Sequence, residues 1–234
     1  MKKIAILGST GSIGSTLIDI IKKDRTKFKV ELLTVNKNYK KLIKQIKIFD
    51  VKNVIITNEK SYLITKKLLK KRNINIYKDF NAIKTIFKNK KIDYTMSAIS
   101  GFIGLKPTLD IIEFTKTIAI ANKESIICGW NLINKKIIRH KTFFIPIDSE
   151  HFSIWSLINN VKTKNVEKVF ITASGGPFRN YPLSRFKNIT PIEALKHPNW
   201  TMGKKISIDS ATMMNKVFEI IEAKKIFNFK YNQL

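Results

Sequence analysis

The segment Gly8–Gly14 constrains the fold of this chain more than any other stretch, because its glycines recur as Gly-x-x-Gly-x-x-Gly. It follows the apolar run Lys3–Leu7, which has the length of one buried strand, and leads into Ser15–Ile21, whose apolar residues fit a helix. Glycines at such a turn let the backbone approach a pyrophosphate, and the helix amino terminus attracts phosphate. The sequence therefore predicts a dinucleotide-binding start, with a plain tight turn as the alternative.

Short apolar runs alternate with helical patterns through the first half of the chain. This alternation predicts a parallel sheet with helices on both faces, an α/β fold whose Rossmann-like first domain covers residues 1–147. We expect strands at 3–7, 30–35, 53–57, 74–77, 92–97, 117–121 and 143–147, and helices near 13–23, 38–49, 59–71, 80–88, 102–114 and 123–134.

The pattern changes in residues 148–234, which we expect to form an incomplete α+β catalytic domain. A strand is predicted at 165–173, followed by a break at Ser174–Pro177. Residues 175–204 lack periodicity, and so long a loop is predicted to be either a functional, flexible flap or a disordered segment. A helix is then predicted from Ser210 to about Phe227, so this region is too poor in strands to complete a domain alone.

The formal net charge of the chain is +27, yet 44% of its residues are hydrophobic, which indicates a globular protein. Five of the 44 basic residues are Arg and the excess is spread along the chain, which favours solvated lysine faces over a nucleic-acid patch. A single cysteine, Cys128, and the lack of any apolar run of membrane-spanning length predict a cytoplasmic protein without a membrane anchor.

The expected second strand ends in Val35–Asn38, which contains Lys37 and no carboxylate. An acid at this place usually binds the ribose 2′-hydroxyl of NAD, whereas a lysine attracts a 2′-phosphate. The sequence thus favours NADP, with an ordinary surface lysine as the alternative.

Two carboxylates, Asp148 and Glu150, follow the last expected strand of the first domain. Adjacent carboxylates repel unless a cation lies between them, and oxygen ligands suit Mg²⁺ or Mn²⁺. A helix cap formed by Asp148 or Ser149 is the alternative, and His151 alone is predicted to pack or cap rather than ligate. Further along, Asn215 and Glu219 lie one helical turn apart, beside Lys216 and downstream of Ser210 at the expected helix start. These side chains could hold a phosphorylated substrate and complete a metal site, or simply cap an amphipathic helix.

Several motifs together resemble those of the 1-deoxy-D-xylulose 5-phosphate reductoisomerase family. They occur in family order along the whole chain. The matching stretches are Gly8–Gly14, Ala121–Ser125, Asp148–His151, Ala173–Arg179, His197–Gly203 and Lys205–Lys216.

The resemblance implies conversion of 1-deoxy-D-xylulose 5-phosphate to 2-C-methyl-D-erythritol 4-phosphate, using NADPH and Mg²⁺ or Mn²⁺, with Co²⁺ as a further candidate. It implies a small phosphorylated sugar as substrate, no nucleic-acid or membrane partner, and homodimers for full-length members. The implied metal ligands are Asp148, Glu150 and Glu219, and the implied catalytic residues are these three with Lys123 and His197. Implied substrate contacts are Ser149, Ser174, His197, Trp200, Ser210, Asn215 and Lys216. Implied cofactor contacts are Gly8, Thr10, Gly11, Ser12, Ile13, Gly14, Asn36, Lys37, Asn38, Asn122, Glu124 and Gly203.

The chain departs from the family pattern at Asn36, where Gly is usual, and family members continue beyond Leu234. An inactive NADPH-binding remnant is therefore a second hypothesis, and a basic nucleic-acid-binding protein is a third.

Overall fold

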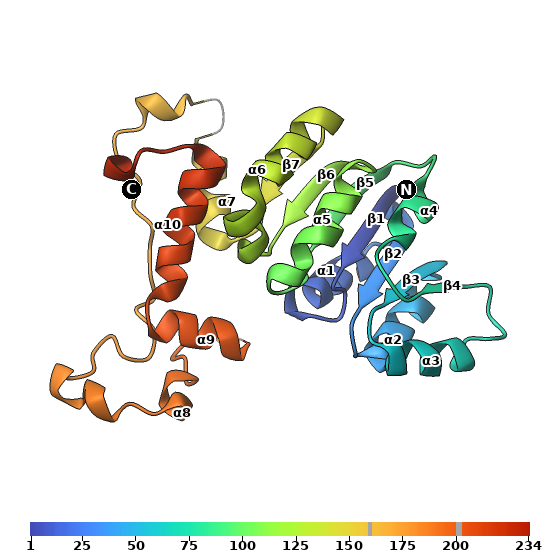
Figure 1. Cartoon of the computed structure of the whole chain (residues 1–234), viewed down its shortest axis with the longest axis horizontal. Helices are drawn as coiled ribbons and strands as arrows, with labels where there is room; N and C mark the ends of the chain where they lie inside the picture. The colour runs from blue at the N-terminus through green and yellow to red at the C-terminus, as the bar shows by residue number, and fades with distance from the viewer. Residues whose placement is uncertain (159–160, 200–202) are drawn as a thin grey trace. The chain divides into compact units, whose positions relative to one another are not determined.

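The computed structural model describes residues 1–158, 161–199 and 203–234 (Figure 1). Its contacts divide the chain into two units, Met1–Asp148 and Ser149–Leu234. The first unit, described throughout, contains a seven-stranded sheet in the order β4-β3-β2-β1-β5-β6-β7, with every neighbouring pair parallel. Its strands are β1 Lys2–Leu7, β2 Phe28–Val35, β3 Asn53–Ile56, β4 Asn75–Tyr77, β5 Ile92–Ser97, β6 Thr115–Ile120 and β7 Phe143–Pro146.

Helices connect successive strands of this sheet. They are α1 Ser12–Lys22, α2 Tyr39–Phe49, α3 Glu59–Leu68, α4 Ala82–Phe87, α5 Leu105–Ile112 and α6 Lys123–His140. The strands proceed in one direction from β1 to β4 and in the other from β5 to β7, so right-handed crossovers distribute the helices over both faces. The predicted α/β fold is confirmed, and the strand order reverses between β1 and β5, where open α/β sheets bind ligands.

Burial on both faces explains why the central strands of this sheet are continuous apolar runs in the sequence. Ile4, Ala5, Ile6 and Leu7 of β1 are all buried, because a central parallel strand is covered on both faces. Helix α6 extends beyond the expected residue 134 and ends at His140, where Lys141 adopts a left-handed conformation with φ 54°.

The second unit is built from short helices around a small apolar cluster. The helices are α7 Ser149–Leu157, α8 Pro191–Ala194, α9 Lys204–Ala211 and α10 Met214–Phe227. The cluster comprises Ile154, Ala223, Phe227 and Phe229, with partly buried neighbours that include Trp155, Val166, Val169 and Ile171.

The predicted strand at 165–173 is wrong. In the structure Asn165 ends a short 3₁₀ turn, and residues 166–173 have no regular secondary structure and belong to no sheet. The Val169 N–H donates to the Gln233 carbonyl oxygen at 2.7 Å. The apolar side chains that suggested a strand pack instead against the small cluster. A strand needs a neighbour along its length, which the residues alone cannot reveal.

The predicted helix from Ser210 to about Phe227 is wrong at its start. Helix α9 begins at Lys204, and α10 begins at Met214 after Met213, whose φ of 61° breaks the helical path. Ser210 therefore lies in the last turn of α9 rather than at a helix start. The expected flap contains a 3₁₀ segment, Leu183–Asn188, and α8, whose amino end is closed by a capping box between Thr190 and Glu193.

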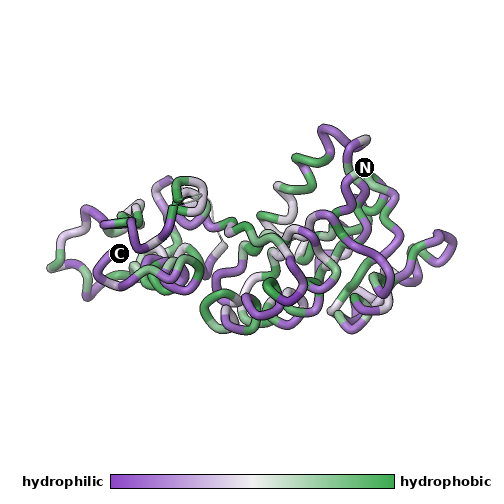
Figure 2. The backbone as a smooth tube through the Cα atoms, turned by 90° about the horizontal axis from the view of Figure 1, so that it is seen from above, coloured by the Kyte–Doolittle hydropathy of each residue, from purple (hydrophilic) through white to green (hydrophobic). Residues whose placement is uncertain are grey.

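Hydrophilic and hydrophobic residues alternate along the chain in both units (Figure 2). Among the described residues, no helix has the length and apolar character needed to cross a membrane.

Candidate functional site

The glycine loop after β1 depends on two of its three glycines. Gly8 has φ 81°, and a Cβ there would lie 2.7 Å from the carbonyl oxygen of Ala98. A Cβ on Gly14 would lie 2.3 Å from the Gly8 carbonyl oxygen, whereas one on Gly11 would meet it at an ordinary 3.4 Å. The close approach of α1 to β1 therefore requires Gly8 and Gly14. The residues predicted to bind the cofactor here, Thr10, Gly11, Ser12 and Ile13, lie between them at the amino end of α1.

A buried polar network, not predicted from the sequence, holds this loop in place. The Ser9 hydroxyl donates to Gln45 Oε1 and the Gln45 amide donates to the Ser9 carbonyl oxygen, both at 2.8 Å. The Gly8 N–H donates to the Thr34 hydroxyl at 2.9 Å. Gln45 lies on the inner face of α2 with the buried residues Leu42 and Ile46. A polar residue at a core position must find a hydrogen-bond partner, and this was the sequence signal that could have predicted the network.

The loop between β2 and α2 presents Lys37 to solvent. The Asn36 amide donates to the Thr57 hydroxyl at 2.8 Å, and Asn38 caps α2 by accepting the Lys41 N–H at 3.2 Å. These two side chains order the loop, and Lys37 remains available to a ligand.

The start of α6 follows β6 in the same unit. Asn122 caps α6 by accepting the Ser125 N–H at 2.9 Å, and its amide donates to the carbonyl oxygens of Ile99 and Gly101. The Lys123 ammonium lies 2.9 Å from Asp148 Oδ2, with both side chains largely buried. Glu124 occupies the first turn of α6, where a carboxylate complements the helix dipole.

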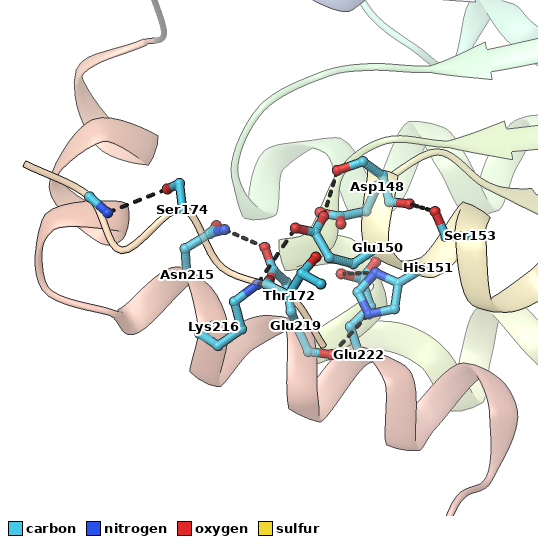
Figure 3. A network of polar contacts seen from close by, with 12 residues as sticks. Asp148, Glu150, His151, Ser153, Thr172, Ser174, Asn215, Lys216, Glu219 and Glu222 are labelled. Carbon is cyan, nitrogen blue, oxygen red and sulfur yellow. Dashed lines mark hydrogen bonds and ion pairs between the residues drawn. The ribbon is translucent and has the colours of Figure 1, made fainter. Parts of the chain in front are cut away.

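Three carboxylates form the core of the acidic site. Asp148 is bonded directly to Ser149, the first residue of α7, and oxygen atoms of Asp148, Glu150 and Glu219 lie within 4.8 Å of one another (Figure 3). Ser149 is inside α7 and its hydroxyl donates to Glu150 at 2.5 Å. Three carboxylates this close repel unless a cation intervenes, and oxygen donors in this number suit Mg²⁺ or Mn²⁺. The donor set therefore fits the divalent metal that the sequence predicted.

Lys216 supplies positive charge to this cluster. Its ammonium donates to Glu219 and to the Thr172 carbonyl oxygen, and lies 3.5 Å from Glu150 Oε1 (Figure 3). Asn215 also donates to Glu219. The predicted pair of Asn215 and Lys216 thus meets the carboxylates directly, with α10 presenting all three side chains.

His151 and Glu222 extend the site inward. His151 is fully buried, with Nε2 2.9 Å from the Glu219 carbonyl oxygen and Nδ1 3.3 Å from Glu222 Oε2. Glu222 was not predicted from the sequence, although its position three residues after Glu219 on one helix was a usable signal. Asp148, His151 and Glu222 form a second group that could hold a metal, but the set with three carboxylates fits Mg²⁺ better.

Two of the residues predicted to contact the substrate, Ser174 and His197, meet at the turn that begins at Ser174. The Ser174 hydroxyl is 3.1 Å from His197 Nε2 and accepts the Gly176 N–H at 3.3 Å. Gly175 and Gly176 both have positive φ, and a Cβ on Gly176 would lie 2.8 Å from the Ser210 carbonyl oxygen. A cavity of about 310 Å³ adjoins this turn, lined in part by Ser174, Gly176 and Arg179. Gly203 caps α9, and Trp200 lies outside the described residues.

These features define a doubly wound α/β protein with a dinucleotide-type glycine loop and an acidic, metal-competent site formed by Asp148, Glu150 and Glu219. A model of 1-deoxy-D-xylulose 5-phosphate reductoisomerase matches residues 4–129, and a model of the C-terminal domain of that enzyme matches residues 144–227. The chain belongs to the 1-deoxy-D-xylulose 5-phosphate reductoisomerase family, as its motifs predicted.

Relatives and solved structures agree with this assignment. The reductoisomerase of Pelagibacter ubique is 70% identical over all of this chain, which covers 61% of that relative. A Zymomonas mobilis reductoisomerase in complex with NADPH is 37% identical, with a TM-score of 0.89 over 99% of this chain and 60% of that one. A complex of the enzyme with NADPH, fosmidomycin and magnesium is 33% identical, with a TM-score of 0.89 over 100% of this chain and 60% of that one. The chain thus spans about three fifths of the length of these relatives.

Proposed function

We propose that the chain takes part in the NADPH- and divalent-metal-dependent conversion of 1-deoxy-D-xylulose 5-phosphate to 2-C-methyl-D-erythritol 4-phosphate in non-mevalonate isoprenoid synthesis. The observation that carries this proposal is the cluster of Asp148, Glu150 and Glu219, in a chain of this family. Solved relatives described as complexes with NADPH and with magnesium support the choice of cofactor and metal.

In the first unit, the glycine loop orients the cofactor. The first-turn N–H groups of α1 bind the pyrophosphate, and Lys37 attracts the 2′-phosphate. Asn122 and Glu124 at the start of α6 are proposed as further contacts, and so are the loop residues Asn36 and Asn38. NADPH, when bound, supplies the hydride for the reduction.

In the acidic site, Asp148, Glu150 and Glu219 would hold Mg²⁺ or Mn²⁺, with Co²⁺ as a further candidate. The metal, when bound, acts as a Lewis acid toward oxygen atoms of the substrate. Lys123 and Ser149 would orient the oxygen-bearing carbons. Lys123 holds the Asp148 carboxylate at 2.9 Å, which keeps that ligand in place before the substrate arrives.

The phosphate of the substrate would bind at the Ser174 turn. Backbone N–H groups at Gly175 and Gly176, whose φ values are positive, can form an anion nest. We propose Ser174, Ser210, Asn215 and Lys216 as the phosphate contacts. His197, Trp200 and Gly203 would belong to a flap over about 175–204 that excludes water from the reaction.

Steady-state turnover and ligand binding test the proposal on the 234-residue chain. We expect NADPH oxidation that requires both 1-deoxy-D-xylulose 5-phosphate and Mn²⁺ or Mg²⁺. NADPH and Mn²⁺ binding are measured in parallel by fluorescence and electron paramagnetic resonance. A folded chain that binds both ligands without turnover would overturn the claim that this chain alone catalyses the reaction, and a chain that binds neither would overturn the whole proposal.

We extend the proposal to assembly and location. The homodimer that the family resemblance implies can be checked by sedimentation of the chain. A cytoplasmic location, with no nucleic-acid or membrane partner, is supported by the single cysteine and the dispersed lysines. DNA binding with a steep dependence on salt would contradict that part.

A further inference from the structure

A lysine outside the family motifs lies between the two nucleotide-binding elements of the first unit. Lys41 is on the first turn of α2, and its ammonium donates to the Ser15 hydroxyl at 2.6 Å. Ser15 is on the first turn of α1 and donates in turn to the Gly11 carbonyl oxygen at 2.5 Å. The Lys41 side chain is partly buried, so its ammonium is held against the glycine loop.

The surroundings of this ammonium favour an anion. A cation beside the amino end of a helix meets the positive end of the helix dipole, which is unfavourable. The first turns of α1 and α2 contain no acidic residue, and the described part of the chain places no carboxylate within ion-pair distance of Lys41. Ser15 accepts one of the three ammonium protons, which leaves donors for a bound ligand.

The position of Lys41 favours one of the two phosphate groups of the cofactor, the 2′-phosphate, over the other, the pyrophosphate. In the proposed cofactor site, the N–H groups at the start of α1 bind the pyrophosphate. Lys41 belongs instead to the helix that follows the β2 loop, where ribose selectivity is usually set. Its own N–H is bonded to Asn38, the cap of α2, so Lys41 and the loop that carries Lys37 are rigidly linked.

We propose that Lys41 is a second cation for the 2′-phosphate of NADPH, and that together with Lys37 it makes the chain select NADPH over NADH. This inference rests on the proposed cofactor function. Lys41 donates to the 2′-phosphate from the side of α1, while Lys37 approaches it from the loop. A charge-assisted bond of this kind, at a partly exposed site, is worth about tenfold in affinity.

The test compares NADPH and NADH dissociation constants, measured by fluorescence titration, for wild type, Lys41→Met, Lys41→Arg and Lys40→Met. Lys40 is exposed on the same helix and controls for loss of general positive charge. We expect Lys41→Met to weaken NADPH binding about tenfold and NADH binding less than twofold. Lys41→Arg should retain most of the affinity, and Lys40→Met should change both constants less than twofold.

Other outcomes overturn the proposal in distinguishable ways. Equal weakening of NADPH and NADH would mean that Lys41 holds the pyrophosphate. Unchanged NADPH binding in a wild-type-like fold would mean that Lys41 binds no cofactor phosphate. A lower unfolding temperature of ligand-free Lys41→Met would assign Lys41 a structural role, whereas we expect an unchanged or higher temperature. Failure of the wild type to bind NADPH would overturn the proposed function as well.

Discussion

The two units are stabilised in different ways. The first buries continuous apolar strands in a parallel sheet, and buried polar side chains such as Ser9 and Gln45 hydrogen-bond to one another. The second has a small apolar cluster, and its interior also contains His151, Glu219 and Glu222, each at most 2% exposed. Burying ionisable groups costs free energy unless they are paired, so the second unit gives up stability to hold a charged site.

This difference predicts that the two units respond separately to mutation. Damage to the apolar cluster, or to Glu150 and Glu219, should affect Ser149–Leu234 and leave the seven-stranded sheet intact. Damage to the glycine loop should do the opposite.

The largest effect is expected from Phe229→Ala. Phe229 is fully buried and packs against Phe227, with ring centroids 5.6 Å apart, and removing such a side chain costs about 3–5 kcal/mol. We expect hydrogen-exchange protection to be lost across the second unit while β1 to β6 remain protected. Phe87→Ala, at a similarly buried position in the first unit, is the matched control and should give the reverse pattern. Uniform loss of protection from either variant would show that the chain unfolds as one unit.

Glu219→Gln should remove most metal binding. Loss of residues that only support metal ligands typically costs 10–100-fold in affinity, so replacing a proposed ligand should weaken Mn²⁺ binding by about 100-fold or more. NADPH affinity should change less than twofold because the glycine loop lies in the other unit. The control is Glu167→Gln, at an exposed carboxylate of the second unit. Retention of normal Mn²⁺ affinity in Glu219→Gln would contradict the ligand assignment.

Gly14→Ala and Gly11→Ala form a pair that tests the glycine loop. The Gly14 variant places a Cβ 2.3 Å from the Gly8 carbonyl oxygen, so we expect a loss of about 1–3 kcal/mol in stability and at least about tenfold in NADPH affinity. The Gly11 variant meets no steric conflict and should keep its stability within about 0.5 kcal/mol. Thermal unfolding and nucleotide titration measure both. Similar losses from both variants would refute the geometric distinction.

The sequence predicted the first unit well because each strand is a short apolar run with its own helix. Periodicity is local, and a central strand buried on both faces looks the same in sequence and in structure. Prediction failed in the second unit where the outcome depends on distant partners. Residues 165–173 have the apolar content of a strand, but they pack on α7 and α10 side chains. Nothing in the sequence marks Met213 as the left-handed residue that separates α9 from α10.

The site was predictable in its residue types but not in its pairings. Asp148, Glu150 and Glu219 were chosen from motif and spacing, and the structure brings their oxygens together. The sequence placed Lys216 with the phosphate, whereas in the structure its ammonium lies among the carboxylates. The contact of Lys216 with Glu219 joins residues three apart on α10, so the spacing allowed it. The approach of Lys216 to Glu150 depends instead on how α7 and α10 pack, which spacing along one helix cannot specify.

Lys216→Met should therefore raise metal affinity while it lowers phosphate affinity. Removing the ammonium takes one positive charge away from Glu150 and Glu219, which favours Mn²⁺ binding by about tenfold on simple electrostatic grounds. Inorganic phosphate binding should weaken, because a proposed contact is lost. Electron paramagnetic resonance measures the first change and calorimetry the second, with the exposed Lys164→Met as control. Weaker Mn²⁺ binding in Lys216→Met would show that Lys216 supports the site rather than competing for it.

The smallest effect is expected near the amino-terminal ends of strands β1, β5 and β6 in the first unit. Hydrogen bonds from the Lys116 ammonium and the Lys3 N–H, both at 2.8 Å, hold the pKa of Asp93 below its ordinary value. A lowered pKa means that the ionised carboxylate contributes stability above the unfolded pKa, about 3.9, and loses it as the pH falls through the folded pKa. Since the pair is partly exposed, Asp93→Asn should cost at most about 1 kcal/mol at pH 7. The difference from wild type in denaturant unfolding should shrink steadily below about pH 4. It should appear only in the transition of the first unit, and its appearance in the second would contradict their independence.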